Sequence, residues 1–221
     1  MSPDLVRVSG PDTWTFLQSL LSQDVLGLAD GERRAALMLT PQGKVEVLLG
    51  VRREGDDAVL DTDPGWGEHL LGLLRRYCIR TKVEMVIEAE GATPDATEDA
   101  ARIAAGIPRL GIDLDDSTIP QEAELDVDAV SFTKGCFVGQ ELVCRIDSRG
   151  HVNRYLRLLE VADGATTVRG AVITADGREV GAVTSAAPGV ALGYVRREVE
   201  PGSGVEVDGV AATVRVRPGR A

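Results

Sequence analysis

The stretch after Gly150 is the part of the sequence that most restricts the fold. It contains the runs VNRYLRLLEVADG, GAVITADGREVGAVTSAAPGVALGYVRREV and SGVEVDGVAATVRVRPG, which are rich in β-formers and broken by glycine. Asp-Gly pairs at 163, 176 and 208 are typical of tight β-hairpin turns. Because no helical period separates these hairpins, the pattern predicts a small antiparallel β-barrel over residues 151–221.

The first 150 residues alternate between helical and strand patterns. Asp12 is a plausible N-cap for a helix over about 12–23, whose apolar residues recur at helical spacing. Residues 33–62 predict three strands, joined by a Pro-Gln-Gly turn at 41–43 and a Gly-Asp-Asp turn at 55–57. A second helix over 65–79, a strand over 82–90 and a short helix before Gly106 follow. We therefore predict an α+β region over 1–150 and a junction near Gly150 to Arg154.

Charge and hydropathy exclude several classes of protein. The net charge of −11 disfavours nonspecific binding to nucleic acid or to an anionic membrane, because both need a basic surface. No apolar run approaches the roughly 18 residues that a membrane span requires, and the start of the chain lacks the pattern of a signal peptide. These features favour a cytoplasmic protein.

Sulfur and imidazole side chains are few. Cys78, Cys136 and Cys144 match neither a disulfide framework nor a CxxC zinc element, so reduced thiols are expected. His69 and His151 lie far apart and outside any HExxH pattern. The chain alone therefore offers no metal cage.

The segment SFTKGCFVGQELVCRID, residues 131–147, places a cysteine before a predicted helix. If the helix begins near Gly139, Cys136 lies just before its first turn, where free N–H groups and nearby Lys134 favour a thiolate. The alternative is that Cys136 packs as a small apolar residue, as most cysteines do. Glu141 and Arg145 could likewise be an ordinary exposed ion pair. We interpret Cys144, inside the helix, as a packing residue that alanine or valine could replace.

Cationic residues gather around the predicted junction. Between residues 134 and 157, five cations face two carboxylates, a local excess of +3 in an acidic chain; the cations are Lys134, Arg145, Arg149, Arg154 and Arg157. This cluster could be a solvated connection between domains. It could equally line a junction pocket for a ligand with a carboxylate tail, in which Glu141 would accept N–H groups of a heterocycle.

Several motifs together resemble one family. KGCFVGQE at 134–141 resembles the signature of the YgfZ family, folate-binding proteins that are related to the aminomethyltransferase (T-protein) of the glycine cleavage system and linked to iron–sulfur cluster assembly. The flanking motifs also resemble that family, in the same order along the chain; they are VSGPDTWTFLQSLLSQDV, LTPQGKV, RIAAGIPRLGIDL, TIPQEAELD, RGHVNRYLR and GAVTSAAPGVALGYVRR. The resemblance therefore covers nearly the whole chain.

The resemblance implies an aminomethyltransferase-like folate-binding fold with a C-terminal antiparallel β-barrel. It implies tetrahydrofolate or a derivative as cofactor, and a working thiolate at Cys136 that could also be one ligand of a transient iron–sulfur cluster shared with a partner. The folate-binding residues carried over by position are Lys134, Gly135, Gly139, Gln140, Glu141, Arg145 and Arg102. The implied partners are iron–sulfur assembly or client proteins, tRNA-modifying enzymes among them, with no direct binding to nucleic acid or membrane.

Two other functions stay open at this point. The chain could be a folate-dependent one-carbon transferase, although a cysteine octapeptide stands where the transferase has its own signature. It could also be a non-catalytic folate-binding module with a structural cysteine. The T-protein relatives use an acidic residue near the folate, but we interpret the loop of Asp113, Asp115 and Asp116 as solvated surface rather than as a source of that residue.

Overall fold

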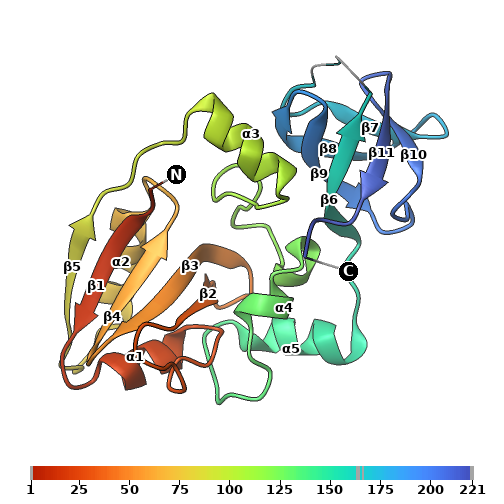
Figure 1. Ribbon diagram of the computed structural model, residues 1–221. Helices are drawn as coiled ribbons and strands as arrows, with labels where there is room; N and C mark the ends of the chain where they lie inside the picture. Colours follow the sequence, from red (N-terminus) through yellow and green to blue (C-terminus); the bar gives the residue numbers. More distant parts are fainter. Residues whose placement is uncertain (1, 163–164, 166, 220–221) are drawn as a thin grey trace. The chain divides into compact units, whose positions relative to one another are not determined.

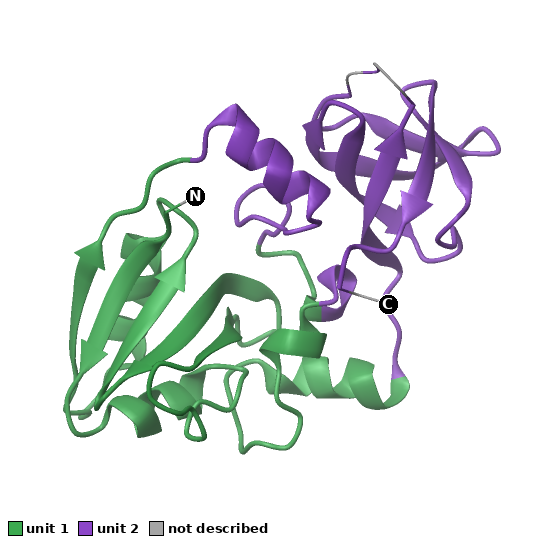
Figure 2. Cartoon of the chain, in the orientation of Figure 1, with its two compact units in different colours: residues 1–93, 116–120, 125–149 green, residues 94–115, 121–124, 150–221 purple. Residues whose placement is uncertain are grey.

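The computed structural model of the protein describes residues 2–162, 165 and 167–219. Contacts within the chain divide it into two compact units, coloured separately in Figure 2. Unit 1 comprises Met1–Thr93, Asp116–Pro120 and Leu125–Arg149, and unit 2 comprises Pro94–Asp115, Gln121–Glu124 and Gly150–Ala221. Unit 2 thus takes two segments from the first 150 residues, and the predicted domain division at residue 150 stays a prediction.

Unit 1 is built on a five-stranded antiparallel sheet with the order β2-β3-β4-β1-β5 (Figure 1). Its strands are β1 (Asp4–Ser9), β2 (Arg33–Leu39), β3 (Val45–Glu54), β4 (Asp57–Thr62) and β5 (Glu84–Ala89). The three strands predicted within 33–62 and the strand predicted over 82–90 are confirmed. Alternation decides the faces: in β1 the side chains of Asp4, Val6 and Val8 are buried, whereas those between them are half-buried.

Helices cover the apolar face of this sheet. They are α1 (Thr13–Leu20), which contacts β4, and α2 (Gly67–Tyr77), which contacts β1 and β5. Leu17, Leu70 and Leu74 are fully buried, so each helix turns its apolar stripe toward the core. Unit 1 also contains the short α4 (Asp126–Ala129), which contacts β2, and α5 (Gln140–Arg149).

The predicted N-cap residue of α1 lies at the expected position, but the predicted capping hydrogen bond is not formed. Asp12 occupies the N-cap position, but its side chain accepts no hydrogen bond from the first turn. Its Oδ2 instead accepts a hydrogen bond from the backbone N–H of Lys82, 2.8 Å away. The carboxylate therefore joins the start of α1 to the segment before β5, a long-range partner that a local capping rule does not consider.

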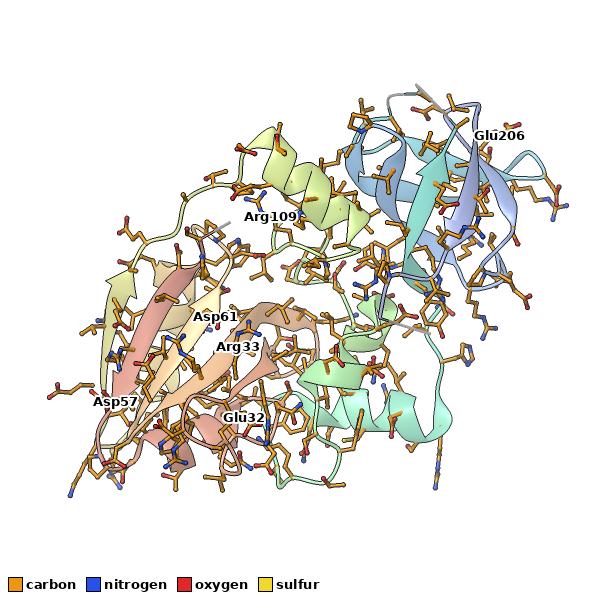
Figure 3. The ribbon with its side chains drawn as sticks, in the orientation of Figure 1. Glu32, Arg33, Asp57, Asp61, Arg109 and Glu206 are labelled. Atoms are coloured by element: carbon orange, nitrogen blue, oxygen red, sulfur yellow. The ribbon has the colours of Figure 1, made fainter. Side chains whose placement is uncertain are left out.

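Charged residues occupy the other face of the sheet, where Figure 3 labels Arg33, Asp57 and Asp61. Arg33 on β2 donates from Nε to Asp61 Oδ1 on β4 across 2.8 Å, although β3 lies between the two strands. Gly50 on β3 makes this possible, since a Cβ there would lie 2.2 Å from the Arg33 guanidinium. The hydrogen bonds that Arg33 donates to Asp61 raise the pKa of the Arg33 guanidinium.

Unit 2 contains the predicted antiparallel barrel, which is closed in the order β10-β11-β6-β9-β8-β7. Its strands are β6 (Arg154–Val161), β7 (Val172–Ala175), β8 (Arg178–Ala187), β9 (Val190–Arg196), β10 (Gly204–Val207) and β11 (Val210–Arg215). Asp176-Gly177 and Asp208-Gly209 both have positive φ angles and join β7 to β8 and β10 to β11, as predicted for primed hairpin turns. The predicted turn at 163 lies outside the described residues.

One helix of unit 2 packs on the outside of this barrel. It is α3 (Ala96–Ala104), which contacts β8 and β9 and follows a capping box formed by Asp95 and Glu98. A short 3₁₀ helix spans Pro120–Ala123. No helix in the described part of the chain combines the length and apolar character needed to cross a membrane.

A buried charge pair fixes α3 to the barrel. The Nη1 of Arg102 lies 2.8 Å from Asp113 Oδ2, and the Asp113 side chain has no solvent exposure. Asp113 Oδ1 also accepts hydrogen bonds from the hydroxyls of Thr184 and Ser185 on β8. The interpretation of the aspartate loop as solvated surface is therefore wrong for Asp113, although Asp115 and Asp116 are exposed.

Candidate functional site

The octapeptide at 134–141 forms a loop that leads into α5. Gly139 immediately precedes the helix and has a φ of 78°. A Cβ at Gly139 would lie 2.4 Å from the Thr40 carbonyl oxygen, because the loop packs directly on the turn between β2 and β3. Gly43 in that turn is equally tight, since its Cβ would lie 2.8 Å from the Gly139 oxygen. Both glycines are therefore required by close backbone approach inside unit 1.

Lys134 anchors the other end of the loop. Its Nζ donates to the carbonyl oxygens of Gln18 and Leu21, each 2.6 Å away, and to that of Gln23 at 3.2 Å. These carbonyls lie at and just beyond the end of α1, where a helix leaves acceptors without partners. All three ammonium protons are used in this way. Lys134 therefore has a structural role in this loop, and its predicted roles as a folate contact and as a cation beside the thiolate stay predictions.

Cys136 lies between these two anchors and is exposed. It lines a cavity of about 440 Å³ in unit 1, whose other walls include Phe132, Gly135, Phe137 and Glu141. Phe137 is buried, and its N–H donates to the Oε1 of Gln140 across 3.2 Å. The Gln140 side chain thus ties the residue after the cysteine to the first turn of α5. This arrangement presents the sulfur to solvent on a loop held at both ends.

Gly135 differs from the other glycine of the octapeptide. A Cβ built on it meets no atom within 4 Å, and its φ lies outside the left-handed region. Among the residues that the structure describes, no contact therefore explains a glycine at this position. Open space beside the exposed sulfur would allow another molecule to approach the backbone closely.

Cys144 was predicted to be a packing residue, and this prediction is wrong. Its side chain is exposed and lines the same cavity as Cys136. Within α5 only Val143 is buried, while Leu142 and Ile146 are half-buried. The sequence spacing could have indicated the place of Cys144, because Gln140 and Cys144 lie four residues apart and therefore share one face of the helix.

Glu141 and Arg145, also predicted to bind the cofactor, are exposed on α5. Along the described chain no ion pair joins them, so the ordinary salt bridge considered from the sequence is not formed. Arg149 is exposed at the end of the same helix. These three side chains are available to a ligand, and their binding role stays a prediction.

The remaining residues of the predicted cationic cluster belong to unit 2 and have protein partners. Arg154 donates to both carboxylate oxygens of Glu122, and its guanidinium lies 4.4 Å from the Tyr194 ring centroid. Arg157 donates to Glu124 Oε1 across 2.7 Å. The sequence excess of +3 therefore overstates the free positive charge, because Glu122 and Glu124 precede the counted stretch.

Arg102 is likewise committed to contacts within unit 2. It donates to Asp99, to Asp113, to the Ile107 carbonyl and to the Ser185 hydroxyl. Its side chain is 5% exposed, so a ligand could reach it only after displacing these acceptors. We therefore assign Arg102 a structural role within unit 2, and its predicted part in folate binding stays a prediction.

Replacing Lys134 by methionine tests its anchoring role. We expect the free energy of unfolding near pH 7 to fall by about 1–3 kcal/mol, because three carbonyls lose a charged donor. Lys44→Met is the matched control, since Lys44 donates to one carbonyl only, that of Ser117. Urea denaturation of both variants measures the difference, and equal losses would contradict a special role for Lys134.

The stability difference between the wild-type protein and Lys134→Met should depend on pH. Burial lowers the pKa of Lys134 to about 8, while nearby Asp24 opposes this effect. The unfolded chain keeps its lysine proton up to a pKa of about 10.4, so between these values the unfolded state binds more protons. The stability of the wild-type protein relative to Lys134→Met should therefore rise from pH 8 to pH 10. A fall over this range would show that the lysine pKa is raised instead.

Comparison with known proteins places these features in a family. Residues 153–218 match the family described as the CAF17 C-terminal beta-barrel domain. An iron-sulfur cluster assembly factor IBA57 homolog from Pyricularia oryzae is 24% identical, over 88% of this chain and 70% of its own. A tRNA-modifying protein YgfZ from Klebsiella pneumoniae is also 24% identical, over 69% of this chain and 67% of its own. The chain is thus similar to YgfZ and IBA57 proteins, in agreement with the resemblance that its octapeptide and flanking motifs indicate.

The fold of this protein is that of an aminomethyltransferase. The glycine cleavage system aminomethyltransferase T from Bartonella henselae superimposes with a TM-score of 0.86, covering 98% of this chain and 83% of that one, at 20% identity. The predicted fold class is thereby confirmed. Identity this low establishes the fold alone, because one fold serves many chemistries.

Proposed function

We propose that the protein is a tetrahydrofolate-binding accessory factor for the assembly or repair of iron–sulfur enzymes, including enzymes that modify tRNA, with Cys136 as its reacting group. The observation that carries this proposal is an exposed cysteine presented on a cavity by a loop that is fixed at both ends. The names of the IBA57 and YgfZ relatives support the iron–sulfur and tRNA context.

The loop geometry suits a thiol that must meet a partner. Lys134 holds the loop on the end of α1, and Gly139 holds it on the turn before β3, so Cys136 is ordered although exposed. Gly135 leaves room for another backbone beside the sulfur. A thiolate in this position could attack an electrophile or bind one iron atom.

A shared cluster would take most of its ligands from elsewhere. The described residues include no group of three or more His, Cys, Asp or Glu side chains that could hold a metal ion. Iron–sulfur clusters are generally held by four protein ligands. The cluster would therefore be cargo passed to or from a partner, with this chain supplying only part of its coordination.

The donor set also fits a folate. Such a ligand offers N–H donors on its pterin and carboxylates on its tail, which match exposed Glu141 and the exposed arginines of α5. Unit 2 has a further cavity of about 630 Å³, lined among others by Arg154, Arg169, Thr184 and Tyr194. Its size lies in the usual range for small-molecule sites. When bound, tetrahydrofolate would supply a one-carbon carrier.

Complementation tests the role of the thiol. In bacteria that lack their own YgfZ-family protein, Cys136→Ala should fail to restore the activity of iron–sulfur enzymes, whereas Cys78→Ala should restore it. Cys78 is the matched control because its thiol is half-buried and lies 3.8 Å from the Thr81 carbonyl oxygen, away from the cavity. Urea denaturation should show both variants folded. Full rescue by Cys136→Ala would refute the thiol's role.

The aminomethyltransferase fold favours a second candidate, a genuine one-carbon transferase. Folate-dependent release of methylene from candidate amines separates the two functions. Sustained turnover that survives Cys136→Ala would favour the transferase. Calorimetric titration with tetrahydrofolate distinguishes both from a protein that binds no folate.

A further inference from the structure

Two thiols share one small cavity in this protein. Cys136 on the loop and Cys144 on α5 are both exposed, and both line the cavity of about 440 Å³ in unit 1. The function proposed above uses only Cys136. The third cysteine, Cys78, follows α2 and does not line this cavity.

The geometry of α5 brings the two sulfurs toward each other. Gln140 and Cys144 lie on the same helix face, about 5–6 Å apart at their Cβ atoms. The Gln140 side chain accepts a hydrogen bond from the N–H of Phe137, so the peptide that follows Cys136 lies against this face. Side chains of an α-helix tilt toward its N-terminus, which directs the Cys144 sulfur toward the loop.

The loop has room to close the remaining gap. A disulfide needs Cα atoms within about 4.4–6.8 Å of each other. Gly135, next to Cys136, has no atom within 4 Å of a built Cβ. Among the described residues, no contact at Gly135 therefore opposes a small movement of the neighbouring Cys136 backbone between the anchors at Lys134 and Gly139.

The surroundings favour oxidation over metal binding. Across the described residues no three ligating side chains converge on a common point, so the two thiols lack the third and fourth ligands of a zinc site. A two-electron oxidation needs only the two sulfurs. We propose that Cys136 and Cys144 form a reversible disulfide when the protein meets a hydroperoxide, and that this bond closes the cavity.

The chemistry balances in two steps. The Cys136 thiolate attacks the terminal oxygen of hydrogen peroxide, the O–O bond breaks, and water leaves once the released hydroxide takes a proton; Cys136 becomes a sulfenic acid. The Cys144 sulfur then attacks that sulfur, the S–O bond breaks, and a second water leaves with the Cys144 proton. Two thiols and one peroxide thus give one disulfide and two waters.

Intact-protein mass spectrometry tests the proposal on the full chain. After reduction and addition of one equivalent of hydrogen peroxide, the wild type should lose two hydrogen atoms, and dithiothreitol should restore them. Peptide mapping should join the peptide of Cys136 to that of Cys144. Cys78→Ser should behave like the wild type, whereas Cys136→Ser and Cys144→Ser should form no internal bond.

Two results would overturn the proposal. One is oxidation of Cys136 to the sulfinic acid while Cys144 stays free. The other is a disulfide-linked dimer in place of the internal bond.

Dibromobimane, which fluoresces on bridging two nearby thiols, provides a measurement that does not depend on peroxide reactivity. It should label the wild type and Cys78→Ser, and loss of the fluorescence in the wild type would also count against the pair. None of these measurements uses folate or an iron–sulfur client, so the outcome is independent of the proposed function.

Discussion

Replacing Asp113 by alanine is expected to lower the free energy of unfolding by about 3–5 kcal/mol, because the Arg102 guanidinium loses its buried counter-ion and keeps only the partly exposed Asp99. The Asp113 side chain is fully buried, and its carboxylate accepts hydrogen bonds from Arg102, from the Arg109 N–H and from two hydroxyls of β8. Four donors would lose their acceptor at once. Urea denaturation followed by circular dichroism measures the loss.

Asp116→Ala is the matched control for this prediction. Asp116 lies three residues further along the chain and is exposed, so its replacement should change the free energy of unfolding by less than about 0.5 kcal/mol. The double variant Arg102→Met/Asp113→Ala should be more stable than the sum of the two single losses predicts, because no unpaired charge remains. Additive losses would show that Arg102 and Asp113 do not act as a pair.

Gly139→Ala is expected to lower the free energy of unfolding by about 2–4 kcal/mol, from left-handed strain and overpacking together. The φ of Gly139 is 78°, and the new methyl group would lie 2.4 Å from the Thr40 carbonyl oxygen. That oxygen belongs to a tight turn, so neither backbone can move without disturbing the other. The loop that presents Cys136 should loosen as well.

Gly135→Ala separates local strain from a general effect of changing the octapeptide. Because a Cβ at Gly135 meets nothing within 4 Å, this variant should keep the wild-type stability to within about 0.5 kcal/mol. Thermal unfolding of the two alanine variants side by side makes the comparison. Equal destabilisation would contradict the assignment of close packing to Gly139 alone.

Local patterns predicted the regular elements of this fold well. The strands within 33–62 and the hairpins of the barrel follow from apolar alternation and from Asp-Gly turns, which depend on neighbours in the sequence. The capping role predicted for Asp12 was wrong, because its Oδ2 accepts a hydrogen bond from the N–H of Lys82, 70 residues away. Turn and strand signals depend on neighbouring residues. Whether the Asp12 carboxylate accepts a hydrogen bond from the first turn of α1 or from Lys82 depends instead on how distant segments pack.

The sequence located the candidate site, but it did not predict the roles of the individual residues in that site. The octapeptide drew attention to Cys136, and the family resemblance agrees with the relatives found. Lys134 was expected to influence the thiol, yet it bonds to carbonyls that precede it by more than 100 residues. A positive charge beside a cysteine can be read from the sequence, but the acceptors that its protons reach cannot.

The sequence by itself determined most of the helices and strands, the barrel, the resemblance to the YgfZ family and the cysteine in the octapeptide, although it did not indicate β1 or α4. Tertiary structure alone decided which charged groups are buried, as with Asp113, and which thiols reach solvent, as with Cys144. The physical reason is that secondary structure depends on residues a few positions apart. Burial depends on which distant segments pack on a given face, and that is settled only when the whole chain folds.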